Sequence, residues 1–274
     1  MKTLYVTDLD GTLLNSKVKL SEYTISAIND LINKGMCFTY ATARSLVSAS
    51  VVTSGLKINM PVVTFNGTFI IDPHTKKDIS SLYFSEKEVE LIKNTLIKYS
   101  VNPLVYGIIN GEEKVSWIKL FENNGIKNYK LSRKGDKRLR PIETIEQLYQ
   151  GNIFYFMCIG DKTELEKLYD YFIDLDKFTC TFQKEIYREE YLCEIYHKDS
   201  SKGNAIKKLM EKLECGKLIT FGDAINDIPM FKISDECYAV ENAVNELKEC
   251  ATGIIESNEN DGVAKWLKKN YKLD

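Results

Sequence analysis

Short apolar segments alternate with amphipathic helical segments at both ends of the chain, and this alternation limits the folds open to it. Ser21 looks like a helix N-cap, followed by an apolar stripe of helical spacing, and Gly35 stands where a helix would end. A helix-like segment also covers residues 46–53. The strand-like segments are residues 4–7, 36–40 and 61–65, and then 218–221, 238–240 and 253–255. A strand–helix–strand order predicts an α/β fold with a doubly wound, Rossmann-like parallel sheet.

The middle of the chain has a different pattern. Ser85 and Glu88 form a capping-box pattern at the start of a helix, and longer aromatic strand-like segments follow. These segments are residues 104–109, 153–159, 178–182 and 186–195, with a helix near 163–173. We therefore expect a core made of residues 1–83 and 193–274, and an α+β cap domain inserted at residues 84–192.

Composition excludes several classes of function. The 274 residues include 39 acidic and 37 basic side chains, and a net charge of −2 gives no general attraction to nucleic acid or to an anionic membrane. The seven cysteines are scattered without a CxxC pair, which argues against a zinc site or a disulfide framework. No apolar run has the ~20 residues of a membrane span, and no leader pattern precedes the first strand. We expect a cytoplasmic protein that is a monomer or a weak homodimer.

Polar residues follow three of the predicted strands. In a parallel sheet, the carboxyl ends of the strands meet at the edge where ligands bind. Four acids at that edge would raise one another's pKa unless a cation lay between them, and all-oxygen ligation suits Mg²⁺. The residues concerned are Asp8 and Asp10, then Thr42 and Arg44, and then Asp223, Asn226 and Asp227.

A phosphate group would also find donors here. Thr42 offers a hydroxyl group, and Lys202 stands at a predicted helix start, where the helix dipole attracts anions. Asp8 could then attack phosphorus as a nucleophile, and Asp10 could serve as general acid and then as general base.

Four segments in this order resemble the motifs of the haloacid dehalogenase-like hydrolases, most closely the Cof-type phosphatases. They read DLDGTLL, ATARS, SSKGNAI and GDAINDIPM, and the insert lies between the second and third. The resemblance implies a Mg²⁺-dependent phosphatase that hydrolyses small phosphorylated metabolites, such as sugar phosphates, through an aspartyl phosphate. It implies Asp8 as nucleophile, Asp10 as acid and base, Asp8, Asp10 (through its backbone carbonyl) and Asp223 as metal ligands, Thr42, Ala43, Arg44, Lys202 and Asn226 as substrate-binding residues, and Asp227 as a supporting residue.

Other interpretations remain open at this point. A phosphomutase of the same superfamily would share these motifs, and a catalytically silent phosphoryl-binding or signalling protein would share part of them. Asn66-Gly67 is either a hairpin turn or part of the site. The basic run at residues 132–140 is typical of a solvated loop, and substrate recognition is the alternative.

Overall fold

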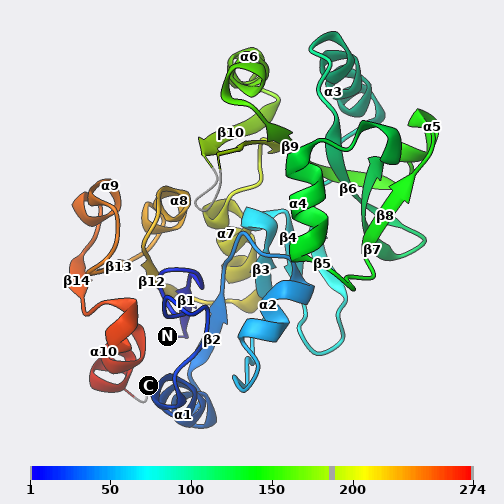
Figure 1. Cartoon of the computed structure of the whole chain (residues 1–274). Coiled ribbons are helices and arrows are strands. Elements are labelled where there is room, and N and C mark those ends of the chain that lie inside the picture. The colour runs from blue at the N-terminus through cyan, green and yellow to red at the C-terminus, as the bar shows by residue number, and fades with distance from the viewer. Residues whose placement is uncertain (1, 185–188, 273–274) are drawn as a thin grey trace. The chain divides into compact units, whose positions relative to one another are not determined.

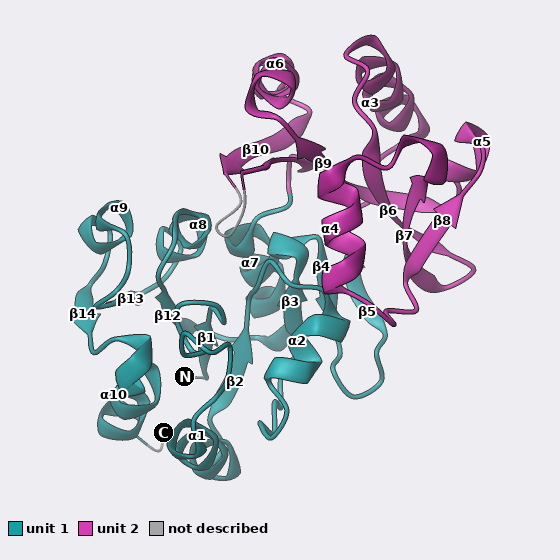
Figure 2. Ribbon diagram, viewed as in Figure 1, with its two compact units in different colours: residues 1–81, 200–274 teal, residues 82–199 magenta. Residues whose placement is uncertain are grey.

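The computed structural model describes residues 2–184 and 189–272, which form two compact units (Figures 1 and 2). The core unit combines residues 1–81 with residues 200–274, and the inserted unit comprises residues 82–199. The expected boundary after residue 192 falls inside β11 (Tyr191–His197). That strand pairs with neighbouring strands of the inserted unit over its length.

In the described part of the core unit, five parallel strands form a sheet with the order β14-β13-β12-β1-β2. The central strand β1 places Thr7 beside Phe221 on one side and Tyr40 on the other. The strands are β1 (Thr3–Thr7), β2 (Cys37–Tyr40), β12 (Lys217–Gly222), β13 (Glu236–Val240) and β14 (Gly253–Ile255). The parallel α/β core is confirmed, and the carboxyl ends of β12, β1 and β2 lie side by side.

Helices connect these strands, and their ends match the sequence signals. The Ser21 hydroxyl accepts a hydrogen bond from the Thr24 backbone N–H at 2.9 Å and so caps the first helix. Gly35 follows the helix with a φ of +99°, a conformation that suits glycine. The helices of this unit are α1 (Glu22–Asn33), α2 (Leu46–Val52), α7 (Lys202–Leu213), α8 (Ile228–Phe231), α9 (Asn245–Glu249) and α10 (Gly262–Asn270).

The third predicted strand does not extend the parallel sheet as expected. It forms β3 (Val62–Thr64), which pairs antiparallel with β4 (Phe69–Ile71), and β4 pairs in turn with β5 (Asp78–Ser81). An isolated parallel bridge between Ala41 and Val63 connects it to the end of β2. The reason is a tight 3₁₀ turn at Phe65–Gly67, which returns the chain alongside β3 at once.

The inserted unit has a sheet of its own, with the order β10-β11-β9-β6-β7-β8 among the described residues. Its pairs are antiparallel except for β7 with β8. The strands are β6 (Pro103–Ile109), β7 (Glu112–Ile118), β8 (Leu139–Ile142), β9 (Asn152–Gly160), β10 (Phe178–Lys184) and β11. Residues 186–188 of the predicted strand 186–195 lie outside the described residues.

Helices of the inserted unit contribute to an apolar core on one face of this sheet. Ile92 and Leu96 come from α3 (Glu86–Lys98), and Leu165 and Phe172 come from α6 (Lys162–Ile173). The predicted capping box of α3 is present. The unit also contains α4 (Asn124–Ser132) and α5 (Ile145–Leu148).

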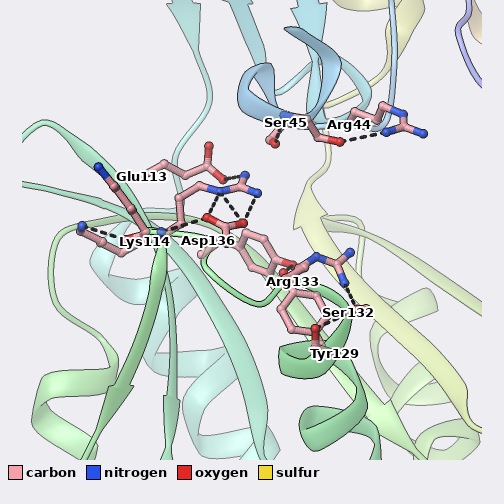
Figure 3. A network of polar contacts seen from close by, with 12 residues as sticks. Arg44, Ser45, Glu113, Lys114, Tyr129, Ser132, Arg133 and Asp136 are labelled. Carbon is pink, nitrogen blue, oxygen red and sulfur yellow. Dashed lines mark hydrogen bonds and ion pairs between the residues drawn. The ribbon is translucent and has the colours of Figure 1, made fainter. Parts of the chain in front are cut away.

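Most of the basic run at residues 132–140 is an exposed turn, as expected of a solvated loop, but its end is ordered by pairing. Residues 139–142 form β8, which pairs with β7, and the Arg138 guanidinium bonds to Asp136 and, at 2.7 Å, to Glu113 (Figure 3). One of the carboxylates that neutralise Arg138, that of Glu113, lies on β7, so this pairing is not apparent from the basic run itself. Across the described residues, no helix has the length and apolarity needed to span a membrane.

Candidate active site

Asp8 and Asp10 follow the central strand β1, and their side chains have different environments. Asp8 is buried, and its backbone N–H donates to the Phe221 carbonyl at 2.9 Å, which continues the pairing with β12. The Asp10 side chain is 48% exposed. Gly11 then turns the chain with a φ of +78°, and a Cβ atom there would lie 2.3 Å from an Asp223 carboxylate oxygen. The glycine therefore allows the two acidic loops to approach.

Lys202, at the start of α7, connects two of the acids. Its Nζ atom lies 2.6 Å from Asp8 Oδ1 and 2.6 Å from Asp227 Oδ1, and the lysine side chain is fully buried. Burial lowers the pKa of Lys202, but the charges of Asp8 and Asp227 more than offset this and the pKa is raised. Lys202 is therefore a fixed cation at the centre of the site.

Asp227 and Asp223 come from the segment that follows β12. The backbone N–H groups of Asp223 and Ala224 donate to Asp227 Oδ2 at 2.9 and 3.0 Å, so Asp227 is held by the loop it belongs to. Asp223 accepts a 2.9 Å hydrogen bond from the Thr12 hydroxyl. Burial and the charge of Asp227 raise the pKa of Asp223 to about 6. Asp223 is thus the acid whose charge is least compensated by fixed partners.

The charges of this cluster leave room for a divalent cation. Asp8, Asp223 and Asp227 offer oxygens that all lie within 4.8 Å of one another, and Lys202 supplies one positive charge against the three carboxylates. Burial and the two other acids raise the pKa of Asp8, while Lys202 lowers it. Clustered carboxylate oxygens are the ligands that Mg²⁺ prefers. The oxygens of Asp8 and Asp223 therefore fit the expected metal, whereas both oxygens of Asp227 already accept bonds from Lys202 and from backbone N–H groups.

The Asp10 carboxylate lies outside this cluster and pairs with Arg44. Nε and Nη2 of Arg44 donate to its two oxygens at 2.6 Å each, and Nη1 donates to Ser48 Oγ at 2.9 Å. Such a two-pronged pair fixes the plane of the carboxylate as well as its position. Arg44, expected at the substrate, thus bonds to the expected acid–base residue. Metal ligation by the backbone carbonyl of Asp10 stays a prediction.

The other expected substrate-binding residues occupy the loops after β2 and β12. Thr42 is buried, and its hydroxyl accepts from the Arg44 backbone N–H at 3.1 Å, whereas Ala43 is exposed. Asn226 is exposed, and its amide donates to Asn66 Oδ1 at 3.1 Å. The Asn66 backbone N–H in turn donates to the Thr42 carbonyl at 2.9 Å. These bonds link the two loops to the 3₁₀ turn.

The Asn66-Gly67 turn is also pressed against the start of α7. A Cβ atom on Gly67 would lie 2.1 Å from the Ser201 carbonyl oxygen, and Gly67 has a φ of +99°. Ser201 directly precedes Lys202, so the turn supports the backbone that presents this lysine. The turn interpretation of Asn66-Gly67 is confirmed, and its part in the site stays a prediction.

Two polar contacts were not predicted as part of the site. Thr12 holds Asp223, and the Asn242 amide donates to the Gly11 carbonyl at 2.8 Å. The DGT sequence was a usable signal for Thr12, because a hydroxyl beside two acids is a ready donor. Asn242 follows β13, far along the chain, and no local pattern marks it.

Known proteins resemble this chain over nearly its whole length. The family model of the haloacid dehalogenase-like hydrolases matches residues 5–267. A Bacillus subtilis protein named 5-amino-6-(5-phospho-D-ribitylamino)uracil phosphatase YwtE is 26% identical, with 95% of each chain covered.

Solved structures show the same fold. A haloacid dehalogenase-like hydrolase from Bacteroides thetaiotaomicron has a TM-score of 0.82 at 19% identity, with 99% of this chain and 100% of that chain covered. A Thermotoga maritima protein has a TM-score of 0.82 at 24% identity, with 100% and 99% covered. Because the family match spans every segment that builds the acidic cluster, the chain belongs to the haloacid dehalogenase-like hydrolase family.

Proposed function

We propose that the chain is a Mg²⁺-dependent phosphatase that hydrolyses small phosphorylated metabolites, such as sugar phosphates, through an aspartyl phosphate on Asp8. The observation that carries the proposal is the position of Asp8, buried between Lys202 and two further acids, with Asp10 two residues later. Two Bacillus subtilis relatives, YwtE and YitU, are named phosphatases of a phosphorylated ribitylamino compound, which supports a small phosphate ester as substrate.

The metal would be held by Asp8, Asp223 and the backbone carbonyl of Asp10. When bound, Mg²⁺ would neutralise charge on the phosphoryl oxygens and on the acids around it. Asp227 would not bind the metal directly, because its two oxygens already accept bonds from Lys202 and from backbone N–H groups. Its role is to hold Lys202 in place.

In the first step, a carboxylate oxygen of Asp8 forms a bond to phosphorus while the bond from phosphorus to the leaving oxygen breaks. Asp10 donates a proton to that oxygen, so the leaving group departs as a neutral alcohol. Lys202 bonds to one oxygen of Asp8 and thereby orients the carboxylate. Thr42, Ala43 and Asn226 would bind the phosphoryl group through side-chain and backbone donors.

In the second step, water attacks phosphorus and Asp10, now ionised, accepts its proton. The bond from phosphorus to Asp8 breaks, which releases phosphate and restores both acids. Arg44 uses one lone pair on each Asp10 oxygen, and a carboxylate has about four, so a site for the proton remains. Arg44 would therefore aim Asp10 in both steps.

The test is phosphate release from a panel of sugar phosphates, nucleotides, pyridoxal phosphate and flavin mononucleotide, with Mg²⁺ and with a chelator. The proposal expects release from at least one ester, loss of turnover in chelator, and recovery with Mg²⁺. Undiminished turnover in chelator would contradict the metal role. Isomerisation of a sugar phosphate without phosphate release would instead indicate a phosphomutase.

A further inference from the structure

The turn that follows Asp8, at residues 9–14, carries the proposed acid–base residue Asp10. The backbone N–H groups of residues 12–14 all donate to the Leu9 carbonyl, at distances between 2.8 and 3.4 Å. These bonds close the turn on itself. Because they are internal to the turn, they do not fix where it lies relative to the other loops of the site.

Two asparagines from distant parts of the chain donate hydrogen bonds to this turn. The Asn242 amide donates to the Gly11 carbonyl at 2.8 Å. The Asn258 amide donates to the Leu14 carbonyl at 2.9 Å. The two asparagines are also bonded to each other, because the Asn258 backbone N–H donates to Asn242 Oδ1 at 3.1 Å. Since Asn242 follows β13 and Asn258 follows β14, both reach the turn from the sheet edge that carries the site.

The segment that contains Asn242 also bonds to the loop of Asp223. The Val244 backbone N–H donates to the Asp223 carbonyl at 2.9 Å. Gly11 and Asp223 lie close together, since a Cβ atom on Gly11 would lie 2.3 Å from an Asp223 carboxylate oxygen. Residues 242–244 are therefore bonded to both loops, and these bonds help to set the spacing between them.

The exposure of the two asparagines argues against a role mainly in stability. Asn242 is exposed and Asn258 is partly exposed. A hydrogen bond that water can replace contributes little net free energy to folding. It can still select one conformation of a loop, and contacts that orient metal ligands change the affinity for the metal. Asn242 uses both its amide donor and its carbonyl acceptor in this way.

We propose that Asn242 and Asn258 are positioning residues, which hold the turn at residues 9–14 in the conformation that binds the metal. Asn242 fixes Gly11, the residue next to Asp10, and Asn258 fixes the end of the turn. Both act through the backbone of the turn. The inference rests on the proposed function, because it assigns the two asparagines to the metal site of that phosphatase.

Calorimetric titration of the full chain with Mg²⁺ at pH 8 tests the proposal. Asn242→Ala should raise the Kd for Mg²⁺ by about tenfold, the lower end of the range for contacts that orient metal ligands. Asn258→Ala should raise the Kd less, because the bond from Asn242 to Gly11 stays in place. In thermal unfolding without metal, both variants should have nearly the Tm of the wild type, because the lost bonds are accessible to water.

Asn29→Ala is the matched control. The Asn29 amide donates to the Gly55 carbonyl at 2.8 Å, and its Oδ1 accepts from the Lys57 backbone N–H at 2.8 Å. The substitution thus removes the same two kinds of bond from a partly exposed asparagine outside the loops of the site. The Kd for Mg²⁺ should stay at the wild-type value in this variant.

Hydrogen–deuterium exchange without metal gives a second readout. The backbone amides of residues 12–14 should exchange faster in Asn242→Ala than in the wild type, because the turn is less restrained, and at the wild-type rate in Asn29→Ala. Wild-type exchange in Asn242→Ala would contradict the positioning role. A large fall in its Tm would show a role in stability instead and would also overturn the inference.

The titrations separate this inference from the proposed function. If the wild type binds Mg²⁺ and Asn242→Ala binds it equally well, the inference is overturned and the proposed metal role stands. An equal loss of affinity in Asn242→Ala and Asn29→Ala would overturn it as well. Absence of Mg²⁺ binding by the wild type would contradict the proposed metal role and this inference with it.

Discussion

Replacement of Lys202 by methionine should make the stability of the fold depend strongly on pH and on metal. The lysine is fully buried and makes two 2.6 Å ion pairs, so Lys202→Met leaves Asp8, Asp223 and Asp227 with no fixed counter-charge among them. Breaking a buried ion pair costs about 3–5 kcal/mol. For a chain of this size, that corresponds to a fall in Tm of roughly 6–20 °C.

The pKa values of the acids determine whether the stability of the variant rises or falls with pH. The pKa of Asp8 is already raised well above its ordinary value and that of Asp223 is raised to about 6. When the pKa of an acid is higher in the folded state than in the unfolded state, protonation of that acid stabilises the folded state. The folded state therefore loses stability as the pH rises through that pKa. The variant should be near wild-type stability at pH 4–5 and weakest at pH 8, and Mg²⁺ should restore part of the loss.

Differential scanning calorimetry at pH 5 and pH 8, with and without Mg²⁺, measures these effects. Lys265→Met is the matched control, because Lys265 pairs with Glu256 at the surface with 44% of its side chain exposed. That variant should leave the stability nearly unchanged at either pH, because an exposed ion pair contributes little. A Lys202→Met variant as stable as wild type at pH 8 without metal would refute the charge argument.

Three further predictions address other parts of the site. Arg44→Ala should lower kcat by about tenfold to a hundredfold for alkyl phosphates and less for nitrophenyl phosphate. The reason is that only the alkyl leaving group needs a proton from a correctly oriented Asp10. Equal losses of kcat for both substrates in steady-state assays would contradict this. Gly67→Ala should destabilise the fold more than Gly35→Ala in thermal unfolding, since both glycines have a φ of +99° but Gly67 alone meets a backbone atom, and equal losses would argue against the clash. The Kd for Mg²⁺ should rise by about tenfold per pH unit below pH 6, because Asp223 must lose its proton to bind the metal. A Kd from calorimetric titrations that stays the same across this pH range would exclude that coupling.

Much of the core could be predicted because its signals are local. The Ser21 cap, the Gly35 stop and the alternation of strands and helices depend on neighbouring residues. The meeting of Asp8, Lys202, Asp223 and Asp227 follows from strand order, since parallel strands bring their carboxyl ends together. The catalytic roles of these residues stay predictions.

Other features depend on contacts between distant residues. The Arg44–Asp10 pair joins two loops that are 34 positions apart, and an arginine in a loop does not reveal its partner. The turn has positive φ at Phe65 and Asn66, and this conformation is unusual for a bulky residue such as Phe65. Strands β7 and β8 of the inserted unit were not predicted, because β7 begins with three charged residues and β8 contains a proline.

The central claim is that Asp8 carries the phosphoryl group, and a trapping measurement with Asp10→Asn tests it most directly. Without an acid–base group, water attack on the aspartyl phosphate should slow by about 10²–10⁴-fold, while transfer from nitrophenyl phosphate continues. Rapid quench should show a burst of nitrophenol, and mass spectrometry should find the phosphoryl group on Asp8. A phosphoryl group on another residue, or turnover by Asp8→Asn, would contradict the account.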